Sequence, residues 1–496
     1  MSKKTTRRNF IKVATLTGAG FWAMAGNASR ARAQANDRPG LAGFATGGKG
    51  ESDIANIARN GCDVTVICDV DRGRLAQAQE RYPNAKAYTD YRKAFDEMEK
   101  SFDLVTVSTP DSTHACIGLM AMRAKKHAYV QKPITRTIYE ARLMGQVARE
   151  MGVVTQMGNQ GSASNRLREG VAQVKAGVLG AIQAVHVWSN RPVWNQGPGR
   201  RNTMAQYAET QRRERPDRAD RVIADMQARY DRELANVDWE SWIGPSPMRE
   251  YFPGLYHPWE HRGWFDFGTG ALGDMACHTF NQPYGAADLK FPTSVQARST
   301  GHDFDSFPQR EEIKFIFPAT ANRPEIECWW YDGGVRPPAE LMEKYGIALD
   351  DRNRSGSLII GEKGVMYDPG DNGGSWQLRA EGGERFDALP TNSLEFPRNP
   401  DQNNYNEFYR AVMANDPSMC FSNFPDYAGP LTETILLGNL AVWAAPTGGP
   451  DGTLGEWGEK IEWDARNLVV TNVSSLKTQG VVELVKPVYR EGHRLD

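Results

Sequence analysis

The chain has 496 residues, of which 40% are hydrophobic and 24% are charged, and its formal net charge is −2. A nearly neutral chain has no broad basic field, so the composition excludes proteins that bind nucleic acid or anionic membranes through such a field. The length allows two or three domains, each with its own core. The six cysteines form no CxxC pair and no zinc-ligand spacing, so we expect buried or free thiols and no metal site.

The first 33 residues have the pattern of an export signal. Arg7 and Arg8 precede a short apolar run rich in glycine and threonine, and Ala31-Arg32-Ala33 is a small-x-small cleavage pattern. The run is too short to span a bilayer. Residues 1–33 therefore resemble a twin-arginine signal, the alternative being a disordered basic tail. We expect the twin-arginine translocase to export the folded chain, and the mature protein to be periplasmic with no membrane segment.

The next segment is predicted to bind a dinucleotide. A strand at 41–45 leads into a glycine-rich turn and a helix, and a second strand at 64–68 ends at Asp69. Backbone N–H groups at such a helix start can hold a pyrophosphate, and a carboxylate about 20 residues later can bind the ribose hydroxyls. The turn residues expected to contact the cofactor are Ala45, Thr46, Gly47, Gly48, Lys49 and Gly50, with alanine in place of the first glycine of GxGxxG. Asp69 would repel a 2′-phosphate, which favours NAD, although Arg72 and Arg74 keep NADP open.

Strands and helices then alternate up to residue 158. Helices are expected at 94–98, 114–123 and 138–149, and strands at 104–108, 127–130 and 153–156. This alternation predicts a parallel sheet whose ligand lies at the carboxyl ends of the strands. The residues expected there, and therefore at the cofactor, are Ser108, Thr109, Pro110, His114, Gln131, Lys132 and Asn159. For His114, a helix-capping or surface position is the alternative.

Four motifs in order give a family resemblance. "STPDSTH", "AYVQKPIT", "MGNQG" and later "WFDFGTGALGDMACHTFN" resemble the Gfo/Idh/MocA oxidoreductases, with Gln131 in place of the usual glutamate before Lys-Pro. The resemblance implies a Rossmann NAD(P)-binding domain at 38–158. It also implies a substrate and oligomerisation α/β domain at 159–496, with a large, open, mostly antiparallel sheet. The implied activity is NAD(P)-dependent oxidation of a sugar, cyclitol or glycoside by a homodimer or homotetramer.

The resemblance assigns the catalytic positions to Lys132, Asp274 and His278. Asp274 and His278 are four residues apart and would share one face of a helix at 273–280. A histidine suits the base that removes a hydroxyl proton, and a lysine ammonium can stabilise the developing alkoxide. We therefore interpret His278 as the base, Lys132 as the stabiliser and Asp274 as the residue that anchors and orients the substrate. The sequence leaves open whether His278 and Lys132 exchange these roles. The Lys132-Pro133 pair predicts a tight turn, in which a cis peptide bond is one of the two alternatives.

The substrate is expected to meet aromatic and polar residues between positions 188 and 264. The rings of Trp194 and Trp264 can stack on a sugar face, with core packing as the alternative for such rings. Asn190 and Arg191 follow an expected strand and can reach substrate hydroxyls.

The charged segment 202–237 is expected to be an insertion that is helical after Pro216. A solvated surface position is favoured, and the alternatives are a cover for the sugar site or a subunit contact. Strands of the second sheet are expected at 185–189, 293–298, 313–317, 326–330 and 357–360, and late helices at 403–413 and 431–444.

The export signal constrains the function. Free NAD is scarce outside the cytoplasm, so an exported enzyme must hold its cofactor tightly and recycle it in place. The leading hypothesis is hydride transfer from a sugar hydroxyl. The alternative is a glycosidase or lyase that works by transient oxidation with no net redox change. A third hypothesis, a non-catalytic sugar-binding protein, leaves the three catalytic positions unexplained.

Overall fold

The computed structural model describes residues 38–321, 323–348, 350, 354–446, 448–449, 452–472 and 483–495. The predicted export signal at 1–33 lies outside these residues. Gly40–Asp496 forms one compact unit. Within the described ranges, no helix has both the length and the apolar character needed to cross a membrane. All six cysteines are free and buried, as expected.

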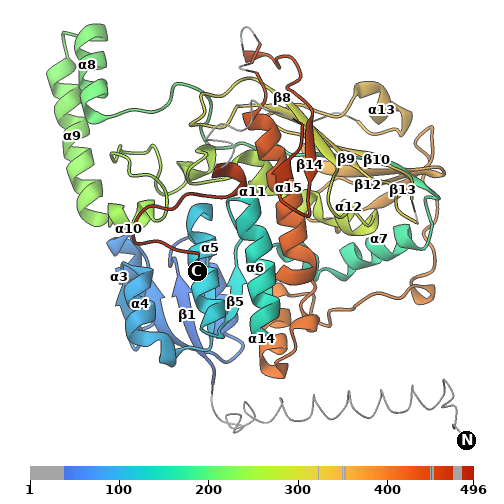
Figure 1. The fold of residues 1–496 in the computed structure, drawn as a ribbon, viewed down its shortest axis with the longest axis horizontal. Coiled ribbons are helices and arrows are strands. Elements are labelled where there is room, and N and C mark those ends of the chain that lie inside the picture. Colours follow the sequence, from blue (N-terminus) through green and yellow to red (C-terminus); the bar gives the residue numbers. More distant parts are fainter. Residues whose placement is uncertain are drawn as a thin grey trace, which may run out of the picture. The chain divides into compact units, whose positions relative to one another are not determined.

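A six-stranded parallel sheet forms the first half of this unit (Figure 1). Its strand order is β3-β2-β1-β4-β5-β6, so the order reverses between β1 and β4. The strands are β1 (Gly40–Phe44), β2 (Asp63–Cys68), β3 (Lys86–Tyr88), β4 (Leu104–Val107), β5 (His127–Val130) and β6 (Thr155–Met157). Its helices are α2 (Lys49–Ala58), α3 (Arg72–Arg81), α4 (Tyr91–Met98), α5 (Asp111–Arg123) and α6 (Ile138–Met151). The predicted parallel sheet is confirmed, whereas the sequence analysis missed β3 and α3.

Local sequence signals set several of these helix ends. Thr137 and Glu140 form a capping box at the start of α6, and Gly152 ends this helix in the left-handed conformation with a φ of 65°. Asp71 caps α3 by accepting hydrogen bonds from the backbone N–H groups of Gly73 and Arg74. The carboxyl end of the sheet, where ligands bind in such folds, is therefore framed by well-defined helix starts.

The second half contains a nine-stranded sheet of order β13-β12-β11-β7-β10-β9-β8-β14-β15. Only β7 and β10 pair in parallel, and the other pairs are antiparallel, which confirms the expected mostly antiparallel sheet. The strands are β7 (Ile182–Trp188), β8 (Ser294–Ser299), β9 (Glu311–Phe317), β10 (Ile326–Tyr331), β11 (Gly356–Gly361), β12 (Gly364–Asp368), β13 (Gln377–Arg379), β14 (Ile461–Asp464) and β15 (Val469–Val470). Of these, β12 to β15 were not predicted.

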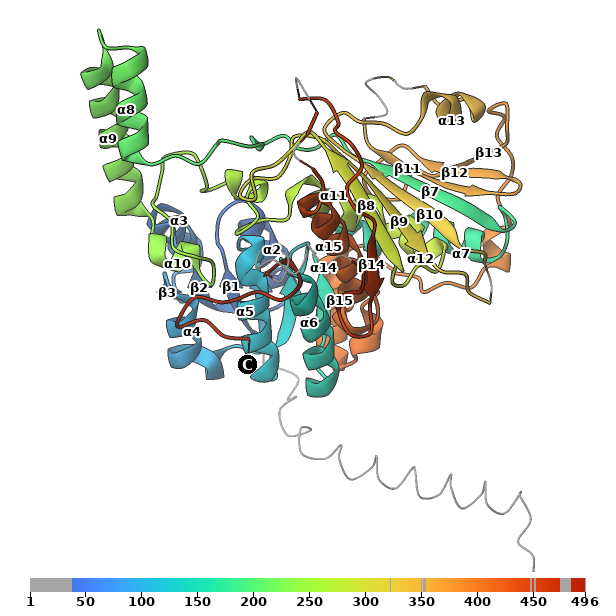
Figure 2. The same cartoon turned by 45° about the horizontal axis from the view of Figure 1, so that its top comes forward.

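Late helices join the two halves. The helix α15 (Gly429–Trp443) is apolar on all sides and lies between the first-half helix α6 and the nine-stranded sheet (Figure 2). The helix α14 (Asn404–Ala414) packs on α2, where Tyr405 and Phe408 contribute to the core around β1. The remaining helices are α7 (Asn165–Lys175), α8 (Met204–Glu214), α9 (Ala219–Asn236), α10 (Trp239–Ile243), α11 (Gly270–Thr279), α12 (Asn281–Ala286) and α13 (Ala339–Lys344). Residues far along the chain thus complete the first half.

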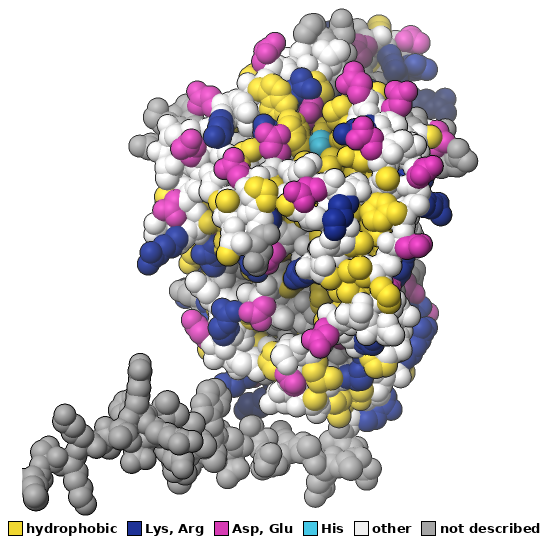
Figure 3. All heavy atoms as spheres, turned by 90° about the vertical axis from the view of Figure 1, so that its right-hand side faces the viewer, with side chains coloured by type: hydrophobic (Ala, Val, Ile, Leu, Met, Phe, Trp, Pro, Cys, Tyr) yellow, Lys and Arg dark blue, Asp and Glu magenta, His cyan; other side chains and the backbone are white. Residues whose placement is uncertain are grey.

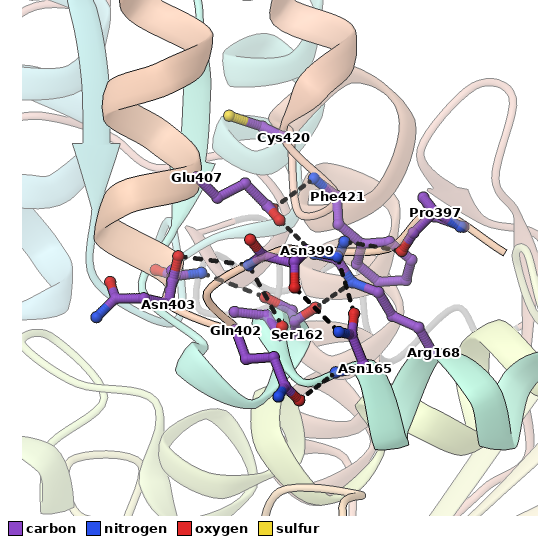
Figure 4. Close-up of polar contacts among 12 residues, drawn as sticks. Ser162, Asn165, Arg168, Pro397, Asn399, Gln402, Asn403, Glu407, Cys420 and Phe421 are labelled. Atoms are coloured by element: carbon purple, nitrogen blue, oxygen red, sulfur yellow. Dashed lines mark hydrogen bonds and ion pairs between the residues drawn. The ribbon is translucent and has the colours of Figure 1, made fainter.

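A buried ion pair fixes one part of this junction (Figure 4). Arg168 of α7 pairs with Glu407 of α14, and both side chains are almost fully buried. Arg168 also donates from Nε to the carbonyl oxygen of Ser162 at 2.8 Å, and Glu407 accepts from the backbone N–H of Phe421 at 3.0 Å. Because the remaining polar atoms are satisfied, the pair can hold α7 against α14 without leaving an unpaired charge.

The charged insertion forms two helices rather than one. The helices α8 and α9 pack against each other as a hairpin that projects away from both sheets (Figures 1 and 2). Helix α8 ends at Glu214, so the prediction of helix only after Pro216 was incomplete. Ala219 is the only buried residue of α9, in agreement with a solvated surface for most of its length.

Candidate active site

A cavity of about 600 Å³ lies between the carboxyl ends of the parallel strands, α11 and the segment 241–262. The turn after β1 lines one end of it with Ala45, Gly47, Gly48 and Lys49, and Asp69 follows β2 beside them. The other end contains Lys132, Asp274 and His278. The cavity is thus long, with a glycine turn and an acid at one end and titratable groups at the other.

The turn itself is held by Asp69. One carboxylate oxygen of Asp69 accepts hydrogen bonds from Thr46, at 2.7 Å from the backbone N–H and 3.2 Å from Oγ1. Gly50 is required where it is, because a Cβ there would lie 2.1 Å from the carbonyl oxygen of Ala45. Thr46 and Gly50 therefore support the turn and do not line the cavity, contrary to their predicted contact with the cofactor.

Ala45 occupies a position that suits glycine. Its φ is 71°, in the left-handed region that costs a residue with a Cβ about 1–2 kcal/mol. The backbone N–H of Ala45 donates to the carbonyl oxygen of Cys68 at 2.8 Å, which holds this conformation. The glycine-rich turn thus forms with alanine in place of the first glycine of GxGxxG, at a cost in backbone strain.

Residues after β4 and β5 form the floor of the cavity. Ser108, Thr109 and Pro110 line it after β4, and Gln131 and Lys132 line it after β5.

His114 also lines the cavity and is 1% exposed, which is incompatible with the surface alternative. Its ring nitrogens lie 2.7 Å from the carbonyl oxygens of Pro133 and Thr109, so it ties the two loops together. The Lys132-Pro133 bond is cis. Asn159 is fully buried and donates to the carbonyl oxygen of Cys277 at 3.3 Å, so it supports α11 and is absent from the cavity lining, contrary to its prediction.

A buried carboxylate explains why position 131 is glutamine. Asp53 of α2 is fully buried and accepts hydrogen bonds from Gln131 Nε2 at 2.8 Å, Ser108 Oγ at 2.8 Å and Tyr405 OH at 2.9 Å. Lys49 forms an ion pair with Asp53 at 3.1 Å. A glutamate at 131 would place a second carboxylate against Asp53, whereas the glutamine amide donates to it. Asp53 was not identified from the sequence, since nothing near it in the chain marks its contact with residue 131.

The three predicted catalytic residues face the same cavity. Lys132 Nζ lies 2.7 Å from Asp274 Oδ1 and 2.6 Å from the Asp274 carbonyl oxygen. Burial alone would raise the pKa of Asp274, but the positive charges of Lys132 and Arg262 hold it well below its usual range. Asp274 is therefore an anion that orients the ammonium of Lys132. Asp274 and His278 are both on α11, which starts at Gly270, three residues before the predicted helix.

His278 is a neutral imidazole at neutral pH. Burial and the nearby charge of Lys132 lower its pKa to about 3. Its Nδ1 is buried and has no hydrogen-bond partner among the described residues. A neutral ring can accept a proton from a hydroxyl, so the geometry is compatible with a base at this end of the cavity.

Two arginines lie beside Asp274. Arg262 Nε is 3.3 Å from Asp274 Oδ1, and Arg191 Nε is 3.7 Å from Oδ2. The Arg262 guanidinium lies over the ring of Trp259, 4.1 Å from its centroid. Arg191 was predicted, and Trp259 is one of the rings between positions 188 and 264 that were considered for sugar stacking. Arg262 was missed, because only the fold brings its loop to α11.

The other predicted substrate residues lie elsewhere. The Trp264 side chain is completely buried, with 0% exposure, and does not line the cavity. Its Nε1 donates to the carbonyl oxygen of Leu255. It belongs to an aromatic core, so the prediction of sugar stacking was wrong. Asn190 and Trp194 line a separate cavity of about 480 Å³ on the other side of the loop that carries Arg191.

The segment after the α8–α9 hairpin covers the nucleotide end. Asn236 Nδ2 donates to Asp71 Oδ1 at 2.7 Å, and His257 Nε2 lies 3.2 Å from Asp71 Oδ2. Trp242 and His257 from this segment line the cavity. The base of the insertion therefore covers the end near Asp69, whereas the alternative weighed from the sequence was a cover over the sugar site.

The lining fits a dinucleotide. The turn after β1 presents its backbone at the start of α2, and Asp69 Oδ1, which accepts a hydrogen bond from the backbone N–H of Asp71 at 2.9 Å, lines the cavity beside it. Among the described residues, no group of three or more His, Cys, Asp or Glu side chains is arranged to hold a metal ion.

Comparison with known families agrees with this arrangement. Residues 38–159 match the model of the Gfo/Idh/MocA oxidoreductase family, NAD-binding Rossmann fold, and residues 226–320 match the C-terminal α/β domain of that family. The chain thus has an NAD-binding Rossmann domain followed by an α/β domain, and the two matches support a relationship to the Gfo/Idh/MocA family.

Curated relatives match one part of the chain. A glycosyl hydrolase family 109 protein of Solibacter usitatus is 33% identical over 153 residues, which is 28% of this chain and 35% of the relative. The D-glucoside 3-dehydrogenase of Escherichia coli is 34% identical over 130 residues, which is 25% of this chain and 35% of that enzyme. The chain therefore spans about a third of the length of these relatives.

Among solved structures, the WlbA dehydrogenase from Bordetella pertussis in complex with NADH and UDP-GlcNAcA has the same fold. It superposes with a TM-score of 0.53 at 13% identity, covering 86% of this chain and 99% of that one.

Proposed function

We propose that this chain, whose two domains match those of one oxidoreductase family, is an NAD-dependent oxidoreductase acting on a hydroxyl of a sugar, cyclitol or glycoside. The observation that carries the proposal is a single cavity. Lys132, Asp274 and His278 open into the same space as the glycine turn and Asp69. A dinucleotide whose pyrophosphate lies at the glycine turn and whose adenosine ribose lies at Asp69 could extend its nicotinamide along the cavity toward a substrate hydroxyl held by Lys132 and His278.

NAD, when bound, would supply the hydride acceptor. The residues of the chain handle the proton and the charge. Asp274 holds the ammonium of Lys132, which can donate a hydrogen bond to the substrate oxygen and stabilise negative charge that develops there. His278 is neutral and can accept the hydroxyl proton. The roles of Lys132 and His278 can be exchanged. The dependence of kcat on pH, measured for Lys132→Met and for His278→Gln, would distinguish the two assignments.

NAD is favoured over NADP as the cofactor. Asp69 stands where a ribose is bound in this fold, and a carboxylate there repels a 2′-phosphate. Arg74 packs over Gly47, within 2.5 Å of a Cβ built on that glycine, and keeps NADP as a second possibility.

A tightly held cofactor is supported by the segment over the nucleotide end. Asn236 and His257 attach that segment to Asp71 immediately after β2, so NAD would have to pass it to leave. We therefore expect purified protein to carry nucleotide. The test is to denature the exported protein and identify the released nucleotide, then to add sugars to intact protein and follow the absorbance of reduced nicotinamide. Protein that neither carries nor takes up NAD would contradict the proposal.

A glycosidase or lyase that uses transient oxidation is the second candidate function. One observation favours it, the 33% identity with a glycosyl hydrolase family 109 protein over 153 residues. Cleavage of a glycoside without accumulation of reduced nicotinamide would support this function over net oxidation. A non-catalytic sugar-binding protein is the least favoured candidate, because it gives no role to the Lys132–Asp274 pair.

The location and assembly are also proposals. The twin-arginine pattern at Arg7 and Arg8 supports export to the periplasm, with the translocase as partner. Cell fractionation of the wild-type chain and of an Arg7→Lys/Arg8→Lys variant tests it, since the variant should stay in the cytoplasm.

We propose that the nine-stranded sheet mediates a homodimer or homotetramer. His186, Trp329 and Tyr331 stack on the face opposite to α15, and Figure 3 shows a band of hydrophobic side chains on the side of the molecule where β13 and α7 lie. Light scattering would test the assembly, and a monomer at micromolar concentration would contradict it.

A further inference from the structure

Three cationic side chains gather around one carboxylate at the substrate end of the cavity. Lys132, Arg191 and Arg262 all approach the single carboxylate of Asp274. Only Lys132, at 2.7 Å, is within the usual distance of a charge-assisted hydrogen bond, whereas the two arginines approach by Nε at 3.3 and 3.7 Å. Asp274 is therefore the closest partner of Lys132, and it accepts only one hydrogen bond from the two guanidinium groups, from Arg262 Nε at 3.3 Å.

One outer nitrogen of each arginine, Nη2, remains available to a ligand. Arg191 Nη1 donates to Asn190 Oδ1, and Arg262 Nη1 donates to the carbonyl oxygen of Trp259 at 3.2 Å. Within the described part of the chain, Nη2 of Arg191 and Nη2 of Arg262 have no hydrogen-bond partner. The two side chains are 26% and 23% exposed, and both line the 600 Å³ cavity. The guanidinium planes thus offer donors to a ligand in that cavity.

Aromatic and acidic groups complete the site around this pair. The ring of Trp259 stacks against the guanidinium of Arg262. The Trp259 side chain is 47% exposed, so part of its ring surface is free to contact a sugar face. Asp371 and Asn372 also line the cavity, and Asp371 Oδ1 is buried without a partner among the described residues. Asp371 can accept hydrogen bonds from ring hydroxyls. With Asp111, which also lines the cavity, the three cations are matched by three carboxylates. An anionic ligand is therefore indicated by the unpartnered Nη2 groups of the two arginines and not by an excess of positive charge.

We propose that the substrate is an acidic sugar, a hexuronic acid or uronide, whose carboxylate binds the Nη groups of Arg191 and Arg262. This inference rests on the proposed function and specifies its substrate class. A planar guanidinium matches a carboxylate in geometry as well as charge, which a lysine ammonium would not do. The carboxylate would fix the ring so that a hydroxyl reaches Lys132 and His278.

The test compares acidic and neutral sugars of the same stereochemistry. Methyl glucuronide and methyl glucoside form one pair, and methyl galacturonide and methyl galactoside form another. Calorimetry on NAD-loaded protein should show at least one acid binding about tenfold or more tightly than its neutral partner. Arg262→Gln should remove that preference, and Arg262→Lys should retain only part of it. Arg149→Gln, which changes an exposed arginine of α6, is the matched control and should leave the preference intact.

Each outcome bears on the inference separately from the proposed function. Equal binding of acid and neutral sugar, failure of every acid to bind, or an equal loss for both in Arg262→Gln would overturn it. A sulfated or phosphorylated sugar that binds while uronides do not would also overturn it. Reduction of NAD by neutral sugars alone would contradict the acidic substrate and leave the oxidoreductase function standing. Tight binding of acids without any redox turnover or cleavage would support the acidic ligand and contradict the oxidoreductase function.

Discussion

The two ends of the cavity are built in different ways. The nucleotide end comes mainly from one continuous stretch, in which Ala45 to Gly50 and Asp69 follow neighbouring strands. The substrate end is assembled from Lys132, Arg191, Arg262 and Asp274, which come from four separate segments. A change at the first end should therefore alter cofactor retention or local stability, and a change at the second end should alter turnover. The following predictions test this separation, from the largest effect to the smallest.

Replacing the ammonium at the substrate end should stop turnover without releasing the cofactor. Lys132→Met removes the group that faces the substrate oxygen, and we expect kcat to fall by about 10²–10⁴-fold. Bound nucleotide, measured after denaturation, should stay at the wild-type level. Asp274→Asn should have a smaller effect in the same direction, because the lysine remains. Loss of nucleotide from the Lys132→Met protein would show that the two ends are not separable.

The stability of the fold should depend on the charge at position 131, which lies against the buried carboxylate of Asp53. Gln131→Glu places a second carboxylate against buried Asp53, so we expect the free energy of unfolding to fall by about 2–4 kcal/mol. The double variant Gln131→Glu/Asp53→Asn should recover most of it, because an asparagine amide can donate to the new carboxylate. Urea denaturation of the three proteins measures the effect. A single variant as stable as wild type would contradict the argument.

The pH dependence of stability should reveal the buried imidazole. The pKa of His278 is lowered from 6.5 to about 3 in the folded chain, so the unfolded chain binds the proton more readily. The contribution is fully present above pH 6.5 and is lost as the pH falls toward 3. Allowing for partial solvent screening, wild type should lose about 2 kcal/mol more than His278→Gln over this range. Parallel denaturation curves with pH for the two proteins would contradict the assignment of a neutral buried ring.

Loosening the cover should affect only cofactor retention. Asn236→Ala/His257→Ala removes both side-chain contacts to Asp71, and we expect NAD to dissociate about tenfold faster. Fluorescence of bound reduced nicotinamide during competition with NAD measures the rate. With saturating NAD, turnover should match wild type. The double substitution Arg213→Ala/Glu214→Ala, at an exposed ion pair of α8, is the control. A slower kcat with unchanged retention would contradict the division of roles.

The smallest effect is expected at the strained turn. Ala45→Gly relieves a residue held at a φ of 71° and should raise the free energy of unfolding by about 0.5–1 kcal/mol, after the greater flexibility of glycine in the unfolded chain is counted. Thermal denaturation without cofactor measures it. A lower melting temperature would mean that the methyl group contributes packing that outweighs the strain.

The sequence determined the features that depend on short-range pattern. The alternation of apolar strands and amphipathic helices specified the parallel sheet, and the glycine turn with Asp69 specified its nucleotide end. The spacing of Asp274 and His278 specified one helix face. The predicted sheet and the shared helix of Asp274 and His278 are confirmed, because hydrogen bonding and side-chain periodicity act between residues close in the chain.

Only the tertiary structure decided which distant side chains meet. It brought Arg262 and Trp259 to Asp274, buried Trp264 in an aromatic core and placed Asp53 against Gln131. It also put the base of the charged insertion over the nucleotide end, where the sequence had left several possibilities. The physical reason is that a contact between distant residues depends on how whole helices and sheets pack, and packing leaves no periodic signal in the chain.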